Sequence, residues 1–280
     1  MFRWASSTST ISSGSTLSDQ PFAIVIPARF ASTRYPGKPL VPLNGKSLIQ
    51  RSWEAAMAVP GCATVIIATD DERIAQAARA FGATVAMTPE ACANGTERCA
   101  AALSAIADDI DIIVNLQGDA PLTPPWFITA IVARLVADAA AAMATPVVRA
   151  TPAVHGRLLA DQAAGRVGGT TAAVSAGGRA LYFSKAVIPH VPEKQRGDPG
   201  LPVFLHIGAY AYRRAGLAAY VAAPVSALEL LEGLEQLRFL DADLPVAVAE
   251  VDPRGRDMWE LNNPQDIAPI EAALTALGIA

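Results

Sequence analysis

Charged residues are scarce in this chain of 280 residues, making up 17% of it against 52% for hydrophobic residues. This composition argues against global disorder and supplies enough apolar surface for a large core. The net charge is −4, so nothing in the overall charge indicates nucleic-acid binding. No apolar run is long and uninterrupted enough to span a bilayer. We therefore expect a folded protein that binds neither nucleic acid nor a membrane.

Cysteine is also rare. Cys62, Cys92 and Cys99 are an odd number, and their spacing is not typical of a metal site. Free thiols are typical of a reduced compartment, so we expect a cytoplasmic protein. Residues 1–20 are rich in Ser and Thr and lack the apolar segment of a secretory signal. They predict a disordered leader, followed by a single α/β domain over residues 21–280.

What the sequence does contain is a regular alternation of short apolar runs and helical patterns. The apolar runs predict strands at 22–27, 63–70, 83–87 and 111–119. The helical patterns cover 47–59, 71–82 and 95–107. Strands that alternate with helices predict a mostly parallel sheet with right-handed crossovers, which is a doubly wound, Rossmann-like α/β fold.

The second half is less regular. We expect strands at 180–184, 206–214 and 245–251, and helices at 226–240 and 263–278. Within the first of these helices, the spacing of Leu230, Leu234 and Leu237 predicts the buried stripe. The same spacing leaves Glu235 and Gln236 exposed to solvent.

The segment IPARFASTRYPGKPL, residues 26–40, follows the first predicted strand. It gathers Arg29, Arg34 and Lys38 without one acidic residue and adds the hydroxyl of Ser32. Ligands of open α/β sheets bind beyond the carboxyl ends of the strands, and such groups suit a polyphosphate. The segment matches neither the Walker pattern nor the dinucleotide-binding glycine pattern. We interpret it as an anion-binding loop rather than a solvated basic loop.

These residues carry a resemblance to the 3-deoxy-manno-octulosonate (KDO) cytidylyltransferase family. Besides the cationic loop, the matching motifs are IIATDDERIAQAA, NGTERCA, IVNLQGDAPL, ALYFSKAVIP, HIGAYAYRR and LEQLRFL, in the family's order. The resemblance implies a nucleotide-diphospho-sugar transferase-like fold. It also implies an enzyme that transfers CMP from CTP to the anomeric hydroxyl of an acidic sugar, first of all KDO. Pyrophosphate is released, and the product serves lipopolysaccharide or capsule synthesis.

The resemblance also implies roles for individual residues. The implied nucleotide-binding residues are Ala28, Arg29, Ser32, Arg34, Lys38, Thr96, Arg98 and Gln117. The implied sugar-binding residues are Tyr182, His206, Tyr210, Glu235 and Gln236. Arg29, Lys38 and Asp119 are implied as catalytic, since such chemistry depends on charge neutralisation and positioning. Asp119 and Asn262 are implied ligands of Mg²⁺.

Four positions depart from the family's pattern. Ala120 and Asn262 stand where the family has carboxylates near the metal, and Leu205 and Thr171 stand where it has cations. Two alternatives therefore stay open. The acceptor could be another ulosonic or nonulosonic acid, such as amino-KDO or a sialic-like acid. The chain could also be a nucleotide-binding homologue that has lost catalysis.

The resemblance further implies a partner. Members of the family tend to pair through an inserted, smaller sheet region, which corresponds here to residues from about 170 to 225. We therefore expect a homodimer.

Overall fold

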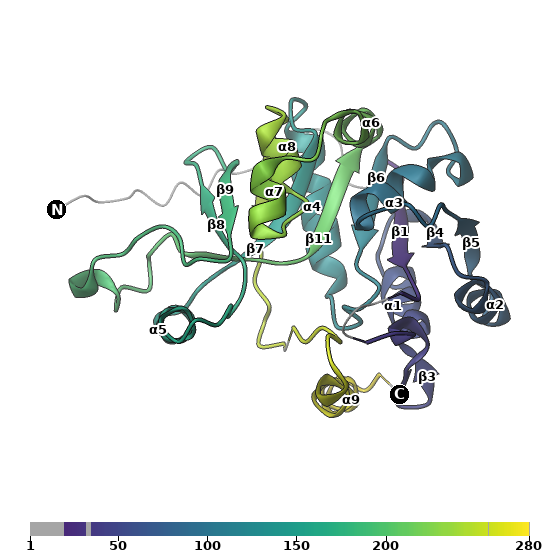
Figure 1. Ribbon diagram of the computed structural model, residues 1–280, viewed down its shortest axis with the longest axis horizontal. Helices are drawn as coiled ribbons and strands as arrows, with labels where there is room; N and C mark the ends of the chain where they lie inside the picture. Colours follow the sequence, from purple (N-terminus) through teal and green to yellow (C-terminus); the bar gives the residue numbers. More distant parts are fainter. Residues whose placement is uncertain (1–19, 32–34, 257, 280) are drawn as a thin grey trace.

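The computed structural model describes residues 20–31, 35–256 and 258–279. The predicted leader lies outside the described residues, apart from Gln20, and so do Ser32 and Arg34 of the cationic loop. The described chain forms one ten-stranded sheet and a separate two-stranded sheet (Figure 1). The prediction of one domain over residues 21–280 stays a prediction, although a single sheet runs through both halves of the chain.

Four parallel strands form the first half of the large sheet, in the order β5-β4-β1-β6. Their bounds are Phe22–Ala28 for β1, Cys62–Thr69 for β4, Thr84–Met87 for β5 and Ile112–Leu116 for β6. The accompanying helices are α1 (Leu48–Met57), α2 (Glu72–Ala80), α3 (Gly95–Ala101) and α4 (Pro125–Ala137). The predicted doubly wound fold is confirmed. Because β4 and β6 lie on opposite sides of β1, the strand order reverses between β1 and β6, where such folds bind ligands.

The second half extends the same sheet in the order β11-β7-β10-β8-β9, with β12 paired to β7. These strands are β7 (Met143–Arg149), β8 (Thr171–Val174), β9 (Ala180–Ser184), β10 (Phe204–His206), β11 (Ala209–Arg213) and β12 (Val246–Glu250). The region from about 170 to 225 thus adds its strands to the main sheet. The separate sheet consists of β2 (Pro42–Leu43) and β3 (Lys46–Ser47).

Three further helices precede or follow α7 and α8, which are described below. They are α5 (Pro152–Ala163), α6 (Arg214–Ala222) and α9 (Ile267–Ala276), with 3-10 turns η2 (Lys38–Leu40), η3 (Leu103–Ala105), η4 (Glu193–Gln195) and η5 (Pro264–Asp266). Helix α9 packs on the β2–β3 pair through Leu43 and Ile270 (Figure 1). None of the helices in the described part of the chain combines the length and hydrophobicity that a membrane-spanning helix requires.

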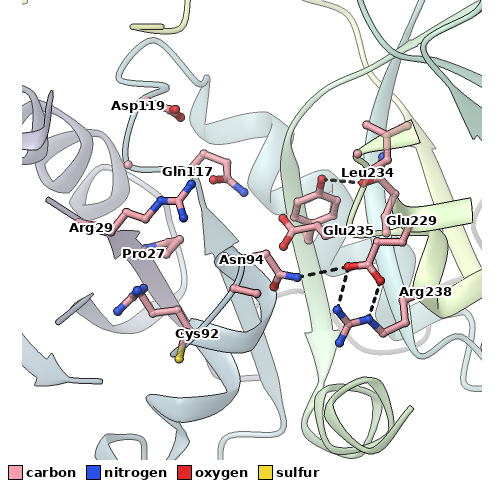
Figure 2. Close-up of a pocket in the computed structure, with 18 of the residues that line it drawn as sticks. Pro27, Arg29, Cys92, Asn94, Gln117, Asp119, Glu229, Leu234, Glu235 and Arg238 are labelled. Atoms are coloured by element: carbon pink, nitrogen blue, oxygen red, sulfur yellow. Dashed lines mark hydrogen bonds and ion pairs between the residues drawn. The ribbon is translucent and has the colours of Figure 1, made fainter. Parts of the chain in front are cut away.

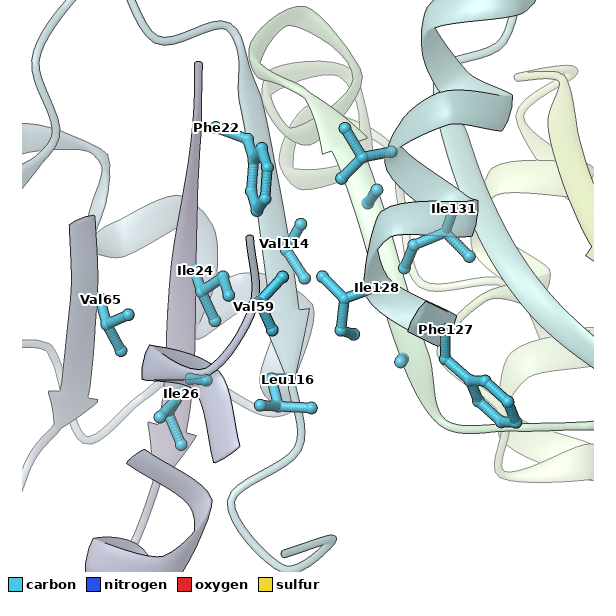
Figure 3. Packing of buried hydrophobic residues seen from close by; sticks show 14 of the residues in the cluster. Phe22, Ile24, Ile26, Val59, Val65, Val114, Leu116, Phe127, Ile128 and Ile131 are labelled. Carbon is cyan, nitrogen blue, oxygen red and sulfur yellow. The ribbon is translucent and has the colours of Figure 1, made fainter. Parts of the chain in front are cut away.

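The core lies on both faces of the sheet. In β1, Ile24 and Ile26 point to the face that α1 and α4 cover, where Ile128 packs (Figure 3). Ala23 and Val25 point to the other face. All four β1 side chains are fully buried. A central parallel strand covered on both faces reads as a continuous apolar run, which is why this strand could be predicted from its sequence.

The prediction of one helix over residues 226–240 is wrong. The chain forms two short helices, α7 (Ala227–Glu232) and α8 (Leu237–Asp241). Gly233 adopts a left-handed φ of 60° and ends α7, so the helical period does not continue across it. As a consequence Leu230 is 72% exposed, whereas Gln236 is only 2% exposed. The prediction is therefore wrong for Leu230 and for Gln236, whereas Leu237 is fully buried as predicted.

Two further boundaries differ from the prediction. The predicted strand over residues 206–214 is divided into β10 and β11, because the chain turns at Ile207, whose carbonyl accepts from Ala209 N at 2.7 Å. The predicted helix over residues 95–107 ends at Ala101 and continues as the 3-10 turn η3. The C-terminal helix begins where predicted, with a capping box on Asn263.

Candidate active site

A cavity of about 680 Å³ lies at the switch point, beyond the carboxyl ends of β1 and β6. Most of the predicted site residues line it. They are Ala28, Arg29, Lys38, Arg98, Gln117, Asp119, Tyr210, Glu235 and Gln236. Figure 2 shows Arg29, Gln117 and Asp119 on one side of this cavity and Glu235 on the other. Motifs separated by more than 100 residues in the sequence therefore meet at one site.

Lys38 and Asp119 form an ion pair at the first side of the cavity. Lys38 begins η2 directly after Gly37, whose positive φ of 73° lets the loop turn back. Gly37 N donates to Phe30 O at 3.0 Å and closes the loop. Lys38 Nζ then reaches Asp119 Oδ2 at 2.6 Å, with side-chain exposures of 15% and 26%. This side of the cavity thus presents the Lys38 ammonium and the Asp119 carboxylate next to each other.

Gly118, the glycine of the QGD motif, allows the segment after β6 to pass close to β1. A Cβ added to Gly118 would lie 2.8 Å from the carbonyl oxygen of Pro27 in β1. Gly118 O also accepts a hydrogen bond from Ser52 Oγ in α1 at 2.9 Å. The absence of a side chain here lets the chain leave β6 next to β1, so that Gln117 and Asp119 line the same cavity.

The two predicted residues of the GTER motif occupy different places. Arg98 lines the cavity, but its guanidinium is held by Asp70 at 2.9 Å and by Thr88 at 2.6 Å. Thr96 is 1% exposed and does not belong to the cavity lining. Its hydroxyl lies 2.7 Å from the hydroxyl of Tyr212. The Thr96 side chain therefore stabilises the wall from behind.

The second side of the cavity presents Tyr210, Glu235 and Gln236. Burial raises the pKa of the Glu235 carboxyl, against the lowering effect of a hydrogen bond from Thr96 N. Tyr210 donates to Gln236 Oε1 at 3.3 Å. Gln236 Nε2 is buried and has no hydrogen-bond partner among the described residues. An unpaired buried donor is costly, so this amide is available for an acceptor group of a ligand.

Besides Thr96, three predicted residues are described but do not line the cavity, namely His206, Tyr182 and Asn262. His206 contacts the ring of Tyr210 at 5.6 Å between centroids, and its Nε2 lies 2.8 Å from Thr145 Oγ1. Burial lowers the pKa of His206 to about 3, so the ring is neutral at physiological pH. Tyr182 packs against the core on the α3 and α6 face. These positions place His206 behind Tyr210.

Asp119 offers a hard oxygen ligand at the cavity, which suits Mg²⁺. Leu261 N donates to Asp119 O at 2.9 Å, so the segment with Asn262 runs next to it. Among residues 20–31, 35–256 and 258–279, no three or more His, Cys, Asp or Glu side chains form a metal-binding group. Mg²⁺ usually binds through one or two carboxylates, waters and substrate phosphates. The residues present fit such an ion.

Three polar residues of the cavity were missed by the sequence analysis, namely Asn94, Glu229 and Arg238 (Figure 2). Asn94 precedes the GTER motif and caps α3, accepting from Glu97 N at 2.9 Å. Its position as a capping residue was the available signal. Arg238 lies within the LEQLRFL motif, and Glu229 is the last residue of a Ser-x-x-Glu pattern in which Ser226 caps α7.

Comparison with known proteins identifies the family. A protein-family model described as cytidylyltransferase matches residues 23–246. The chain belongs to the cytidylyltransferase family. It is 44% identical over 254 residues to a 3-deoxy-manno-octulosonate cytidylyltransferase of Maricaulis maris, covering 91% of this chain and 97% of that protein. A protein of the same description from Zea mays is 38% identical, covering 91% of this chain and 81% of that protein. The resemblance predicted from the motifs is confirmed, and the chain is a nucleotidyltransferase.

Solved structures agree with this assignment. A CMP:2-keto-3-deoxy-manno-octonic acid synthetase complexed with CTP matches with a TM-score of 0.80 and 32% identity, covering 92% of this chain and all of that one. A 4-diphosphocytidyl-2C-methyl-D-erythritol synthase from Anaerococcus prevotii matches with a TM-score of 0.57 and 11% identity, covering 91% of this chain and 99% of that one. The second match concerns the fold alone.

Proposed function

We propose that this cytidylyltransferase transfers CMP from CTP to the anomeric hydroxyl of KDO, giving CMP-KDO and pyrophosphate for lipopolysaccharide or capsule synthesis. This function rests on one observation. Across one cavity at the switch point, Arg29, Lys38 and Asp119 face a polar wall formed by Tyr210, Glu235 and Gln236. The relatives named as KDO cytidylyltransferases support KDO as the acceptor.

The first wall binds the nucleotide in this scheme. Arg29 and Lys38 neutralise the charge that develops on the departing pyrophosphate as the sugar oxygen attacks the α-phosphorus. Ser32 and Arg34 belong to the same loop and contribute to the same task. The other proposed contacts to the nucleotide are Ala28, Thr96, Arg98 and Gln117. Thr96 is included from the resemblance, although its hydroxyl bonds to Tyr212 and its backbone N–H to Glu235.

The second wall binds the acceptor. Glu235 accepts hydrogen bonds from sugar hydroxyls, and the unpaired Gln236 Nε2 donates one. Tyr210 orients Gln236 through their mutual hydrogen bond. His206 supports Tyr210 from behind, and Tyr182 remains a proposed sugar-site residue of the same sheet region. The sugar is thereby held opposite the triphosphate for in-line attack.

Mg²⁺ is the proposed metal. Asp119 would hold it, together with the amide oxygen of Asn262, which offers oxygen but no charge. When bound, the ion supplies positive charge against the phosphate oxygens. Asp119 also pairs with Lys38 through Oδ2 at 2.6 Å, so Mg²⁺ would compete with Lys38 for this carboxylate.

A homodimer and a cytoplasmic location complete the proposed function. Strand β9 ends the large sheet, and Leu181 on it is 63% exposed, which suits pairing with a second copy. The three cysteines are free, as in a reducing compartment. Analytical ultracentrifugation tests the dimer; a single species with the mass of one chain would contradict it.

Incubation with CTP, MgCl₂ and KDO tests the activity by release of pyrophosphate. We expect turnover with KDO, and CMP-KDO as the product. Turnover with another ulosonic or nonulosonic acid, but not with KDO, would refute KDO as the acceptor. CTP binding without turnover on any acidic sugar would refute the catalytic function altogether.

A further inference from the structure

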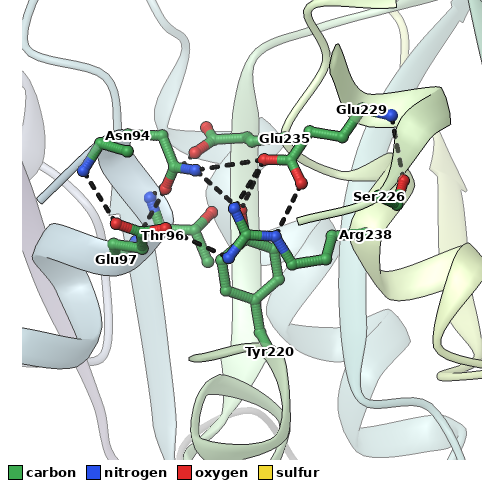
Figure 4. A network of polar contacts seen from close by, with 9 residues as sticks. Asn94, Thr96, Glu97, Tyr220, Ser226, Glu229, Glu235 and Arg238 are labelled. Carbon is green, nitrogen blue, oxygen red and sulfur yellow. Dashed lines mark hydrogen bonds and ion pairs between the residues drawn. The ribbon is translucent and has the colours of Figure 1, made fainter. Parts of the chain in front are cut away.

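Arg238 is a buried cation beside the cavity that the proposed chemistry does not use. Its side chain is 4% exposed and pairs in parallel with both oxygens of Glu229, at 2.7 and 2.8 Å (Figure 4). Its Nη1 donates to Glu97 Oε1 at 3.1 Å. The guanidinium also lies 4.1 Å from the ring centre of Tyr220. One guanidinium thus binds two carboxylates and an aromatic ring that come from three different helices, α7, α3 and α6.

These contacts join the two walls of the cavity. Glu97 belongs to α3, which carries the GTER motif of the nucleotide side, whereas Glu229 belongs to α7 of the acceptor side. Two neighbouring contacts also link the nucleotide side of the cavity to the acceptor side. Asn94 Nδ2, at the cap of α3, lies 3.5 Å from Glu229 Oε1, and Thr96 N donates to Glu235 Oε2 at 3.0 Å. Residues 229–238, which we call the acceptor-side segment, therefore contact α3 and its capping residue through three polar contacts.

We infer that Arg238 is a positioning residue, which holds Glu235 and Gln236 at the correct distance from the nucleotide through Glu229 and Glu97. The inference rests on the proposed function, since it concerns the acceptor of that same site. Gly233 interrupts the helix between Glu229 and Glu235 with a left-handed turn. Because no continuous helix fixes this segment, its position depends on the contacts at both ends, and Arg238 supplies the contact next to Glu235.

Lysine cannot replace arginine in this place. A guanidinium presents a planar fork that binds both oxygens of one carboxylate and keeps a further donor for another group. An ammonium keeps the charge but is a point donor, so it loses the parallel pair with Glu229 or the contact with Glu97. Arg238→Lys therefore loosens the segment without leaving two buried carboxylates unbalanced, which keeps the variant able to fold.

The first test compares Michaelis constants. In Arg238→Lys we expect the KM for KDO to rise by about tenfold or more, with the KM for CTP changing by less than about threefold, since small displacements of reacting groups are expensive. Glu229→Gln should give the same split. Both changes disrupt the same Arg238–Glu229 ion pair. The KM for KDO of the double variant should therefore be no higher than that of the more affected single variant.

Arg213→Lys is the matched control. Arg213 is a partly buried arginine that binds Leu135 O at 2.9 Å and Asp111 Oδ2 at 3.3 Å, at the far end of β11 from the cavity. It should lower the melting temperature without raising the KM for KDO. Equal KM values for KDO in wild type and Arg238→Lys, or a rise in Arg213→Lys of the same size, would overturn the inference.

A second readout does not depend on turnover. Hydrogen exchange at the Thr96 amide reports its bond to Glu235 directly. We expect exchange there to accelerate by about tenfold or more in Arg238→Lys and not in Arg213→Lys. Unchanged protection of this amide would overturn the inference. If the wild type does not consume CTP with KDO, the proposed function fails, and the exchange measurement still decides the role of Arg238.

Discussion

The backbone N–H of Thr96 donates to Glu235 Oε2 at 3.0 Å, although 139 positions separate the two residues in the sequence. Thr96 belongs to the GTER motif, and Glu235 belongs to the LEQLRFL motif. This hydrogen bond links the acceptor side of the cavity, which carries Glu235, to the GTER motif of the nucleotide side, while Glu235 lies across the cavity from Asp119 (Figure 2). A carboxylate held in this way has a defined position and a reduced exposure to water.

The pKa of Glu235 provides a test of this burial. Burial raises the pKa above its ordinary value of 4.5, so the folded protein binds this proton more strongly than the unfolded chain does. The stabilisation from that proton is present below the ordinary pKa and is lost as pH rises through the raised folded pKa. Glu235→Gln cannot titrate. We expect the melting temperature of wild type to fall relative to that of the variant as the pH rises above 4.5. A relative gain of wild type over this range would contradict the burial.

Replacement of Lys38 tests the anion-binding loop. Lys38→Ala removes a charged partner of the proposed triphosphate, and hydrogen bonds to charged groups contribute roughly 1.5–3 kcal/mol. We expect CTP affinity to fall by about ten- to a hundredfold, measured by calorimetry. Lys46→Ala is the control, because Lys46 pairs with Glu54 outside the cavity lining. Equal CTP affinity in both variants would refute the loop assignment.

Lys38→Ala should have the opposite effect on metal affinity. Lys38 Nζ lies 2.6 Å from Asp119 Oδ2 and competes with a metal ion for this carboxylate. In the absence of CTP, Lys38→Ala should therefore bind Mn²⁺, a spectroscopic substitute for Mg²⁺, more tightly than wild type. Asp119→Asn should bind it more weakly than Lys38→Ala. Electron paramagnetic resonance of free Mn²⁺ measures both, and weaker binding by Lys38→Ala than by wild type would refute the competition.

Gly118 should not tolerate a side chain. Gly118→Ala would place Cβ 2.8 Å from Pro27 O, which is backbone and cannot rotate away. We expect a loss of about 1–3 kcal/mol in unfolding free energy, as for overpacked sites, together with weaker CTP binding. Gly156→Ala in α5 is the control, since a Cβ there meets nothing within 4 Å. It should leave stability unchanged or raise it slightly. Similar stability of the two variants would contradict the close approach of β1 and β6.

His206 predicts a pH dependence of stability at acidic pH. Its pKa falls from 6.5 to about 3 through burial, so between these values the unfolded chain binds a proton that the folded protein does not. Stability therefore decreases as pH falls through this window, by about 1.4 kcal/mol per pH unit for one proton. His206→Gln removes this contribution. In urea unfolding, the free energy of unfolding should depend less steeply on pH in the variant than in wild type. An identical pH dependence in the two proteins would contradict a neutral His206.

The sequence was sufficient where one local rule decided the outcome. β1 is covered on both faces and therefore reads as an uninterrupted apolar run. The cationic loop after it indicates its function by residue type, so Arg29 and Lys38 could be assigned to an anion-binding site, and the family resemblance added Asp119. The cavity places these residues together as expected.

The sequence was insufficient where tertiary contacts outweighed the local pattern. The leucines of residues 226–240 have helical spacing, but Gly233 redirects the chain, so Leu230 faces solvent and Gln236 is buried. Thr96 is a small polar residue in a binding motif, yet its hydroxyl bonds to Tyr212 from a distant strand. Arg238 lies within a quoted motif, but its role could not be inferred, because its partners lie on separate helices and no spacing relates them.

A crystal soaked with CTP tests the central claim most directly. We predict that the triphosphate lies against Lys38 and Arg29 beside Asp119, with the α-phosphate facing the wall that carries Glu235 and Gln236. A triphosphate bound elsewhere, or Lys38 and Arg29 without contact to it, would contradict the account.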